Sequence, residues 1–218
     1  MKKLVIFGGR GIGMIAASVA NDIGDYNFLG FLNDVVPVGE TIGVYSKHKV
    51  IGTSNDFLKF MKDDNVLFFI GYIGMKSEKE VFEKINSFQI PSDRYATLIH
   101  PTAVIPKGYC KIGNGVLMAP LVQISPDTTI EDNCILLPNS FLGHDSTMKR
   151  FSHITANSVV GGNVTLGYGA HIGTNATIRE NVVVGDFSIV GSGSVVLHNI
   201  PNNSIYIGNP AKLLRKND

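Results

Sequence analysis

An aliphatic residue returns at every sixth position through a long stretch of this chain, roughly residues 99–196. From Ile112 onward, fifteen positions spaced six apart are all Ile, Leu, Val or Met. A mostly small or β-branched residue stands four places after each of them, and the place directly after is often glycine. The aliphatic positions are Ile112, Met118, Ile124, Ile130, Leu136, Leu142, Met148, Ile154, Val160, Leu166, Ile172, Ile178, Val184, Val190 and Val196.

A period of six is neither the 3.6-residue period of a helix nor the two-residue alternation of an ordinary strand. It is typical of a short strand and a tight corner, repeated, as in hexapeptide β-helices. We expect the aliphatic side chain to point into the coil, the small residue to fill the corner, and the glycine to allow backbone geometries closed to residues with a Cβ atom. Three hexapeptides close one triangular coil, so residues 18 apart would stack at about 4.8 Å. The pattern predicts a left-handed parallel β-helix, with the handedness of known hexapeptide proteins; a β-sandwich with this spacing by accident is the weaker alternative.

The chain opens with an apparent strand, glycine turn and helix. Lys3–Phe7 is a continuous apolar run of the kind found in buried parallel strands. The turn Gly8–Gly13 leads into Met14–Ile23, which has helical apolar spacing, and backbone N–H groups at such a helix start can hold phosphate. The dinucleotide fingerprint G-x-G-x-x-G does not fit, because Met14 stands where its third glycine should be, and NAD is therefore disfavoured. A tight connection with no ligand is the alternative reading of the turn.

The rest of the N-terminal part reads as a small α/β unit. Asp34 follows an apparent second strand, where an acidic residue can contact a ribose or base or can simply serve a turn. Residues 1–97 are predicted to form a Rossmann-like half-domain with about three parallel strands, enough for one mononucleotide. Residues 98–218 are predicted to form the β-helix, of five to six coils, and a C-terminal tail. The further elements expected are a strand at Phe28–Leu32, a loop with a short strand over Val35–Val50, a helix over Ser54–Met61 capped by Ser54, a strand at Val66–Ile70 and a helix over Lys76–Phe88.

Composition narrows the class of partner. The net charge is +1 and 17% of the residues are charged, so nothing indicates nucleic acid or an anionic membrane as partner. Two cysteines imply no disulfide framework. No apolar run approaches the roughly 20 residues of a membrane span, and the N-terminus lacks the pattern of a signal peptide. We therefore expect a soluble cytoplasmic protein.

Three histidines fall within the regular steps from Ile112 to Val196, and their spacing is informative. His153 lies nine residues after His144, which is half of an 18-residue coil, so the two would stand on opposite sides of one column. They could share a site only across an interface, and a trimer of side-by-side columns provides one. His171 is 18 residues after His153 and would stack beside it on the next coil, which as a histidine ladder could be purely structural.

The pair His144-Asp145 interrupts the repeat with a carboxylate next to an imidazole. Such a pair suits general-base chemistry, because the anion orients the ring and stabilises its protonated form. A plain surface turn is the alternative. A zinc site of His144, His153 and His171, on the model of γ-class carbonic anhydrases, is disfavoured because the histidine pair five residues apart typical of that class is absent. No metal is expected.

Eight short stretches, in this order and spacing, together resemble one known family. They are Phe7–Gly13, Phe31–Asp34, Phe68–Gly74, Leu98–Pro101, His144-Asp145, Phe151–His153, Gly161–Val164 and Ile207–Lys212. They are similar to the PglD/NeuD-type bacterial nucleotide-sugar acyltransferases, in which a small α/β domain precedes a left-handed β-helix. The resemblance covers the whole chain. It implies transfer of an acetyl group from acetyl-CoA to an amino group, usually at C4, of a nucleotide-linked deoxysugar, in homotrimers with active sites between subunits.

The resemblance also implies roles for single residues of the β-helix. His144 would be the general base that takes a proton from the sugar amine, and Asp145 would orient it. His153 of the partner subunit would bond the acetyl carbonyl, and the Gly162 N–H would stabilise the oxyanion. Asn139 would lie near the sugar. Lys212 would line the CoA channel.

In the N-terminal domain, the resemblance implies that the turn residues Gly8, Gly11 and Gly13 hold the nucleotide together with Asp34. Many relatives have histidine where this chain has Ile12, and Arg10 is a larger, charged residue in the same turn that could itself reach a diphosphate. The identity of the nucleotide, whether UDP, GDP or dTDP, stays open at this point.

Three other functions remain as alternatives. The nearest is O-acetylation of a sialic-acid-type sugar, which would use the same base. A catalytically silent nucleotide-sugar-binding scaffold is disfavoured by the His144-Asp145 pair. A metal-dependent hydratase would require a metal ion at the histidines.

Overall fold

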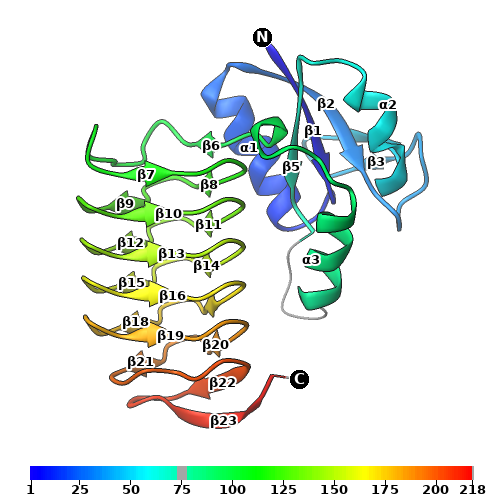
Figure 1. Cartoon of the computed structure of the whole chain (residues 1–218). Coiled ribbons are helices and arrows are strands. Elements are labelled where there is room, and N and C mark those ends of the chain that lie inside the picture. The colour runs from blue at the N-terminus through cyan, green and yellow to red at the C-terminus, as the bar shows by residue number, and fades with distance from the viewer. Residues whose placement is uncertain (73–77, 218) are drawn as a thin grey trace. The chain divides into compact units, whose positions relative to one another are not determined.

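The computed structural model of the chain describes residues 1–72 and 78–217 (Figure 1). The chain divides into two compact units, Met1–Leu98 and Ile99–Asp218. The first unit mixes helices with a sheet, and the second consists of short strands. Each unit has its own core.

The first unit is built on a five-stranded sheet in the order β3-β4-β2-β1-β5. Neighbouring strands are parallel from β4 through β2 and β1 to β5, and β3 is antiparallel to β4. Every residue of β5 and the last four of β1 are buried, which agrees with their continuous apolar runs. The strands are β1 (Lys2–Phe7), β2 (Tyr26–Leu32), β3 (Thr41–Ile42), β4 (His48–Gly52) and β5 (Val66–Ile70).

The expected number of about three strands was therefore too low. Both additional strands come from the segment Val35–Val50, for which the sequence predicts a loop with one short strand. The β4 strand joins the sheet through long-range pairing with β2, such as Phe31 with Val50. No local period in the sequence predicts this long-range pairing.

The helices agree with the predicted positions to within a few residues. They are α1 (Ile12–Ile23), the 3₁₀ helix η1 (Ser54–Asp56), which runs into α2 (Phe57–Met61), then α3 (Glu78–Ser87) and the 3₁₀ turn η2 (Ser92–Arg94). The predicted cap Ser54 is wrong, because Thr53 and Asp56 form the capping box, with the Thr53 N–H donating to Asp56 Oδ2 at 2.7 Å. The predicted start of the last helix, at Lys76, lies outside the described residues.

The second unit is a three-sided parallel β-helix made of two-residue strands (Figure 1). One face contains β7 (Lys111–Ile112), β10 (Thr129–Ile130), β13 (Thr147–Met148), β16 (Thr165–Leu166) and β19 (Val183–Val184). The next contains β9 (Gln123–Ile124), β12 (Phe141–Leu142), β15 (Val159–Val160), β18 (Thr177–Ile178) and β21 (Val195–Val196). The third contains β6 (Leu98–Ile99), β8 (Leu117–Met118), β11 (Ile135–Leu136), β14 (His153–Ile154), β17 (His171–Ile172), β20 (Ile189–Val190), β22 (Ser204–Ile207) and the antiparallel β23 (Lys212–Lys216).

The register of the coils follows the six-residue period. Residues 18 apart pair across neighbouring coils, as Thr129 does with Thr147. The repeated aliphatic positions from Met118 to Val196 are at most 4% exposed and form one continuous core, and Ile112 packs against its end. Burying each such side chain is worth roughly 1.5–3 kcal/mol, and a coil obtains this stabilisation only from its neighbours.

The glycines of the repeat act differently from what the sequence predicts. The left-handed backbone conformation occurs three places after the aliphatic, mostly at Asn and Asp, whose short polar side chains tolerate it. The glycine directly after the aliphatic has no such angle. A Cβ atom at Gly161, for example, would lie 2.7 Å from the backbone nitrogen of Glu180 on the next coil. These glycines therefore allow neighbouring coils to approach closely. The left-handed Asn and Asp residues are Asp127, Asn133, Asn139, Asp145, Asn157, Asn163, Asn175 and Asn181.

Candidate active site

His144 and Asp145 form an exposed pair at the corner between β12 and β13. The His144 Nδ1 and Asp145 Oδ2 atoms are 2.6 Å apart, with the two side chains 68% and 59% exposed. Asp145 is in the left-handed conformation with φ of 59°, and its N–H donates to the Pro126 carbonyl of the preceding coil at 3.2 Å. The contact fixes the orientation of the imidazole and leaves Nε2 for a reacting group.

Gly162 lies one coil further on, at the position that stacks on His144. A Cβ atom on Gly162 would be 2.7 Å from His144 Nε2 and 2.8 Å from Cε1, so the imidazole lies against the glycine Cα. Within residues 1–72 and 78–217, no group accepts a hydrogen bond from the Gly162 N–H. A basic nitrogen and an unused backbone donor are thus neighbours.

His153 and His171 stack on adjacent coils, as their spacing predicts. They pair in register on β14 and β17, and their ring centroids are 5.9 Å apart at an interplanar angle of 83°. His153 Nε2 and His171 Nδ1 are buried and have no hydrogen-bond partner among the residues that the structure describes. Burial, and for His153 also the neighbouring His171, lowers the pKa to about 3 for His153 and about 4 for His171. Both rings are therefore uncharged at neutral pH, and each carries one N–H and one lone pair.

The remaining predicted residues of the β-helix lie away from His144 within one subunit. Asn139 is at the other end of β12, where its Nδ2 donates to Asn157 Oδ1 at 2.9 Å. Lys212 is exposed at the start of β23, the outermost strand of its sheet. His153 is on a different face of the coil from the corner that carries His144. One subunit thus brings together only His144, Asp145 and Gly162.

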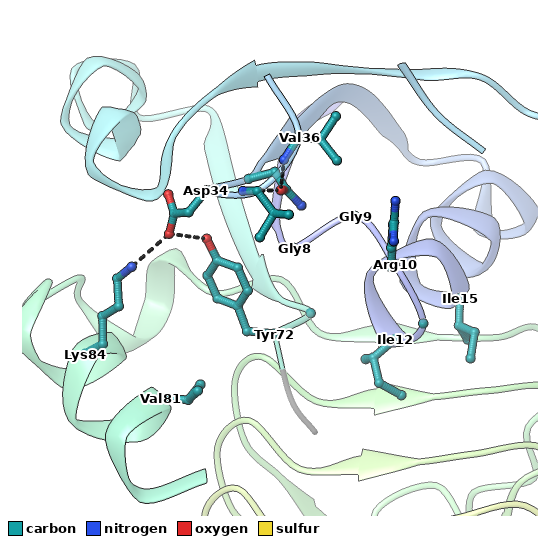
Figure 2. A pocket seen from close by; sticks show the side chains of 14 residues that line it. Gly8, Gly9, Arg10, Ile12, Ile15, Asp34, Val36, Tyr72, Val81 and Lys84 are labelled. Carbon is teal, nitrogen blue, oxygen red and sulfur yellow. Dashed lines mark hydrogen bonds and ion pairs between the residues drawn. The ribbon is translucent and has the colours of Figure 1, made fainter. Parts of the chain in front are cut away.

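The first unit contains a cavity of about 630 Å³ at the carboxyl ends of its parallel strands (Figure 2). Gly8, Arg10, Gly11 and Asp34 line it, four of the five residues predicted to hold a nucleotide. The fifth, Gly13, supports the turn, since a Cβ atom there would lie 1.8 Å from the Gly8 carbonyl oxygen. No side chain caps the start of α1, whose N-cap is Gly11, and of its first N–H groups that of Gly13 donates to the Arg10 carbonyl oxygen at 3.2 Å.

Asp34 is the centre of a polar cluster on one side of this cavity (Figure 2). Its Oδ1 accepts from the Ser54 N–H at 2.7 Å, and its Oδ2 from Lys84 Nζ at 2.8 Å and from the Tyr72 hydroxyl at 3.3 Å. Partial burial raises the pKa of the Asp34 carboxyl, but the hydrogen bonds from Lys84 and Ser54 outweigh it and the net pKa is lowered. Burial and the neighbouring Asp34 raise the pKa of Tyr72. The cluster therefore presents an ionised carboxylate and a neutral phenol.

Arg10 lies on the other side of the cavity from Lys84 in the view of Figure 2. It also lines a second cavity of about 590 Å³, which shares the glycine turn with the first. Its guanidinium has no ion-pair partner among the described residues. Both the unpaired cation and the uncapped helix start favour a phosphate group at this turn.

Comparisons with known proteins agree with both units. Residues 3–85 match the model of the PglD N-terminal domain. The N-terminal unit is therefore similar to this domain over most of its length. The acetyltransferase domain of PglB from Neisseria gonorrhoeae is 26% identical and covers 98% of this chain and 100% of its own, with a TM-score of 0.85. That domain has also been solved with acetyl coenzyme A, with a TM-score of 0.84.

A further match is PerB from Caulobacter crescentus, solved with CoA and GDP-perosamine. It is 24% identical, covers 99% of this chain and 98% of its own, and has a TM-score of 0.83, which shows a likeness in fold alone. No curated protein matches the chain. The resemblance to PglD/NeuD-type acyltransferases and the left-handed β-helix fold are confirmed.

The cavity of the first unit includes two residues that sequence reasoning did not single out, Tyr72 and Lys84. Lys84 is 50 residues from Asp34, and nothing in its helix distinguishes it from a solvated lysine. Tyr72 falls within the stretch Phe68–Gly74 that carries the family resemblance, but without an assigned role.

The described part of the chain lacks both a cluster of metal ligands and a helix that could span a membrane. It contains no group of three or more His, Cys, Asp and Glu side chains arranged to hold a metal ion. None of its helices is both long and apolar enough to cross a membrane.

Proposed function

We propose that this protein transfers the acetyl group of acetyl-CoA to the amino group of a nucleotide-linked 4-amino-deoxysugar. The observation that carries the proposal is the His144–Asp145 pair at 2.6 Å, set against Gly162 with its unused N–H. The whole-chain match to an acetyltransferase domain that has been solved with acetyl coenzyme A supports the same reaction.

The chemistry follows from these three residues. The sugar amine attacks the thioester carbonyl carbon while His144 Nε2 takes one of its protons. Asp145 holds Nδ1 and stabilises the imidazolium that forms. The Gly162 N–H faces the developing oxyanion, a contribution usually worth about 3–4 kcal/mol. When the C–S bond breaks, the proton passes from His144 to the thiolate, which leaves as free CoA.

The nucleotide occupies the cavity of the N-terminal domain in this proposal. The diphosphate lies at the turn Gly8–Gly13, where the start of α1 and Arg10 supply N–H groups and positive charge. Asp34, kept ionised by Lys84 and Ser54, accepts hydrogen bonds from the ribose or the base. Residues 1–97 thus bind the nucleotide sugar, and residues 98–218 bind acetyl-CoA and carry the catalytic base.

The active site is completed between subunits of a homotrimer. This part of the proposal rests on the half-coil separation of His144 and His153, which places them on different sides of one column. His153 of the partner subunit, uncharged because its pKa is low, donates its N–H to the acetyl carbonyl. Asn139 contacts the sugar, and Lys212 contacts the CoA.

A thiol-release assay tests the reaction directly. The full-length protein is incubated with acetyl-CoA and UDP-, GDP- or dTDP-linked 4-amino-deoxysugars, and free CoA and the acetylated product are measured. His144→Ala is expected to lower kcat at least a hundredfold. His198→Ala is the matched control, because His198 is exposed, occupies the same corner position three coils further on, and is followed by Asn199 instead of an acid.

The outcomes separate the proposed reaction from its alternatives. Full turnover by His144→Ala would refute the general base. Turnover only on sugars that offer a hydroxyl at the acceptor carbon would establish O-acetylation instead. Size measurements in solution that give a monomer with full activity would refute the site between subunits.

A further inference from the structure

Ser146 is a fully buried polar residue two places after His144. Its hydroxyl donates to the Gly161 carbonyl oxygen at 3.1 Å and lies 3.3 Å from the His144 carbonyl oxygen. The same hydroxyl accepts from the Val164 N–H at 3.1 Å. One small side chain therefore bonds both to the corner that carries His144 and to the corner of the next coil.

The two corners are also joined by the backbone. The Asn163 N–H donates to the His144 carbonyl oxygen at 2.7 Å. Gly162 therefore lies between two bonded groups, the Gly161 carbonyl, which accepts from Ser146, and the Asn163 N–H, which donates to His144. The imidazole of His144 lies against Gly162. A Cβ atom on Gly162 would come within 2.7 Å of His144 Nε2, so the ring has little room to move on that side. A small displacement of either corner would separate Nε2 from the Gly162 N–H.

The position of Ser146 in the repeat requires a small side chain but no hydroxyl. The same slot holds Thr128 one coil earlier and Val164 one coil later, and both are buried. Packing alone therefore accepts an aliphatic residue of similar size here. The Thr128 hydroxyl donates to the Ser125 carbonyl of its own corner at 3.1 Å, whereas Ser146 also bonds to the next coil, at the Gly161 carbonyl and the Val164 N–H.

We propose that Ser146 is a positioning residue for His144, holding the imidazole in place against the bare Cα of Gly162. This inference rests on the proposed function of His144. Removal of the hydroxyl leaves the Val164 N–H without its acceptor and releases the bond to the Gly161 carbonyl. The two corners then lose their link through Ser146 and are joined by the Asn163–His144 backbone bond, and the base shifts from its alignment with the oxyanion donor. A misplacement of this kind typically lowers turnover by a factor of ten to about a hundred.

The test compares three serine variants by steady-state kinetics. Ser146→Ala is expected to lower kcat ten- to a hundredfold with the KM values for both substrates unchanged. Ser146→Thr keeps the hydroxyl, as Thr128 does in the same slot, and is expected to restore at least half of kcat. Ser158→Ala is the matched control, since Ser158 is also fully buried, bonds to the Gly173 carbonyl at 2.7 Å and lies at the corner between β14 and β15. It should keep the wild-type kcat.

A second readout does not depend on catalysis. The ¹⁵N chemical shifts of the His144 ring, measured by NMR, should move in Ser146→Ala and stay in place in Ser146→Thr and Ser158→Ala. Equal kinetic losses in Ser146→Ala and Ser158→Ala, or an unmoved His144 ring in Ser146→Ala, would overturn the inference. Lack of acetyl transfer by the wild-type protein would refute the proposed function alone, and the ring signals would still decide the role of Ser146.

Discussion

The buried pair His153 and His171 makes the stability of the β-helix depend on pH. The perturbation is protonation of these two imidazoles. His153 Nε2 and His171 Nδ1 have no hydrogen-bond partner among the described residues. In the folded chain the pKa of His153 is about 3 and that of His171 about 4, because burial penalises the charged form. In the unfolded chain both are near the ordinary value of about 6.5.

The sign of the effect follows from these pKa values. Above about pH 6.5 both rings are neutral in both states, and the full stability is present. As the pH falls below 6.5, the unfolded chain binds protons that the folded chain excludes, so the free energy of unfolding decreases. One pKa unit corresponds to about 1.4 kcal/mol, so each ring lowers the free energy of unfolding by up to about 3 kcal/mol between pH 6.5 and about pH 4.5.

Urea unfolding followed by circular dichroism at several pH values in this range measures the effect. The double variant His153→Asn/His171→Asn lacks both titrating rings and should lose most of the pH slope. The quantity compared is the slope of the free energy of unfolding against pH, so a general loss of stability in the variant does not obscure the result. The exposed His198, replaced by Asn, is the control and should leave the slope unchanged. Equal slopes for the wild-type protein and the double variant would refute the reasoning.

Two further predictions concern the core of the β-helix and the glycine turn of the first unit. Leu166→Ala removes a fully buried side chain from the β-helix and should cost about 2–5 kcal/mol in urea unfolding, whereas Val183→Ala on the outer side of the same sheet, 45% exposed, should cost less than about 0.5 kcal/mol. A similar loss in both would mean that the inward positions are not the core. Gly13→Ala places a Cβ atom 1.8 Å from the Gly8 carbonyl oxygen and should abolish binding of nucleoside diphosphates in calorimetry. At Gly11 an added Cβ atom would meet open space. Gly11→Ala should therefore lower the free energy of unfolding only by the strain of its φ of 54°, about 1–2 kcal/mol, as measured by thermal unfolding. Wild-type binding by Gly13→Ala would contradict the role of the turn.

The fold of the β-helix could be predicted because its long-range contacts follow a period that is visible in the chain. Residues 18 apart pair in every coil, so counting along the sequence places Thr129 beside Thr147 and His153 beside His171. The structural role of the glycines that follow the aliphatic positions could not be predicted in the same way. A glycine suggests an unusual backbone angle as readily as close contact between backbones, and only the coordinates show that Gly161 needs the second.

The sheet of the N-terminal unit was only partly predictable. β1 and β5 are continuous apolar runs and were found to within one residue. β3 and β4 are short and each contains exposed residues, so the sequence predicts only one short strand and a loop where the structure has two strands. Their position in the sheet depends on the pairing of β4 with β2, which is set by the tertiary fold.

The same contrast explains which parts of the site could be proposed from sequence. In the β-helix the proposed base His144 and its neighbour Gly162 are separated by one coil, so their spacing already implies that they are adjacent. In the cavity of the first unit, Asp34 meets partners that are 20, 38 and 50 residues away, at Ser54, Tyr72 and Lys84. These sequence separations are not multiples of one repeat length, so the sequence alone does not indicate that the residues meet.

A solenoid also limits how its site can change. The backbone around His144 is fixed by hydrogen bonds to residues about 18 places before and after it, such as the bonds of Asp145 to Pro126 and of Asn163 to His144. An insertion between His144 and Gly162 would therefore move the base off its neighbour unless it added a whole coil. The cavity around Asp34 has no such constraint, because its residues come from separate elements that can be altered one at a time. We therefore expect the acetyl-transfer chemistry to stay constant among chains of this architecture, while the choice of nucleotide changes through residues such as Arg10 and Lys84.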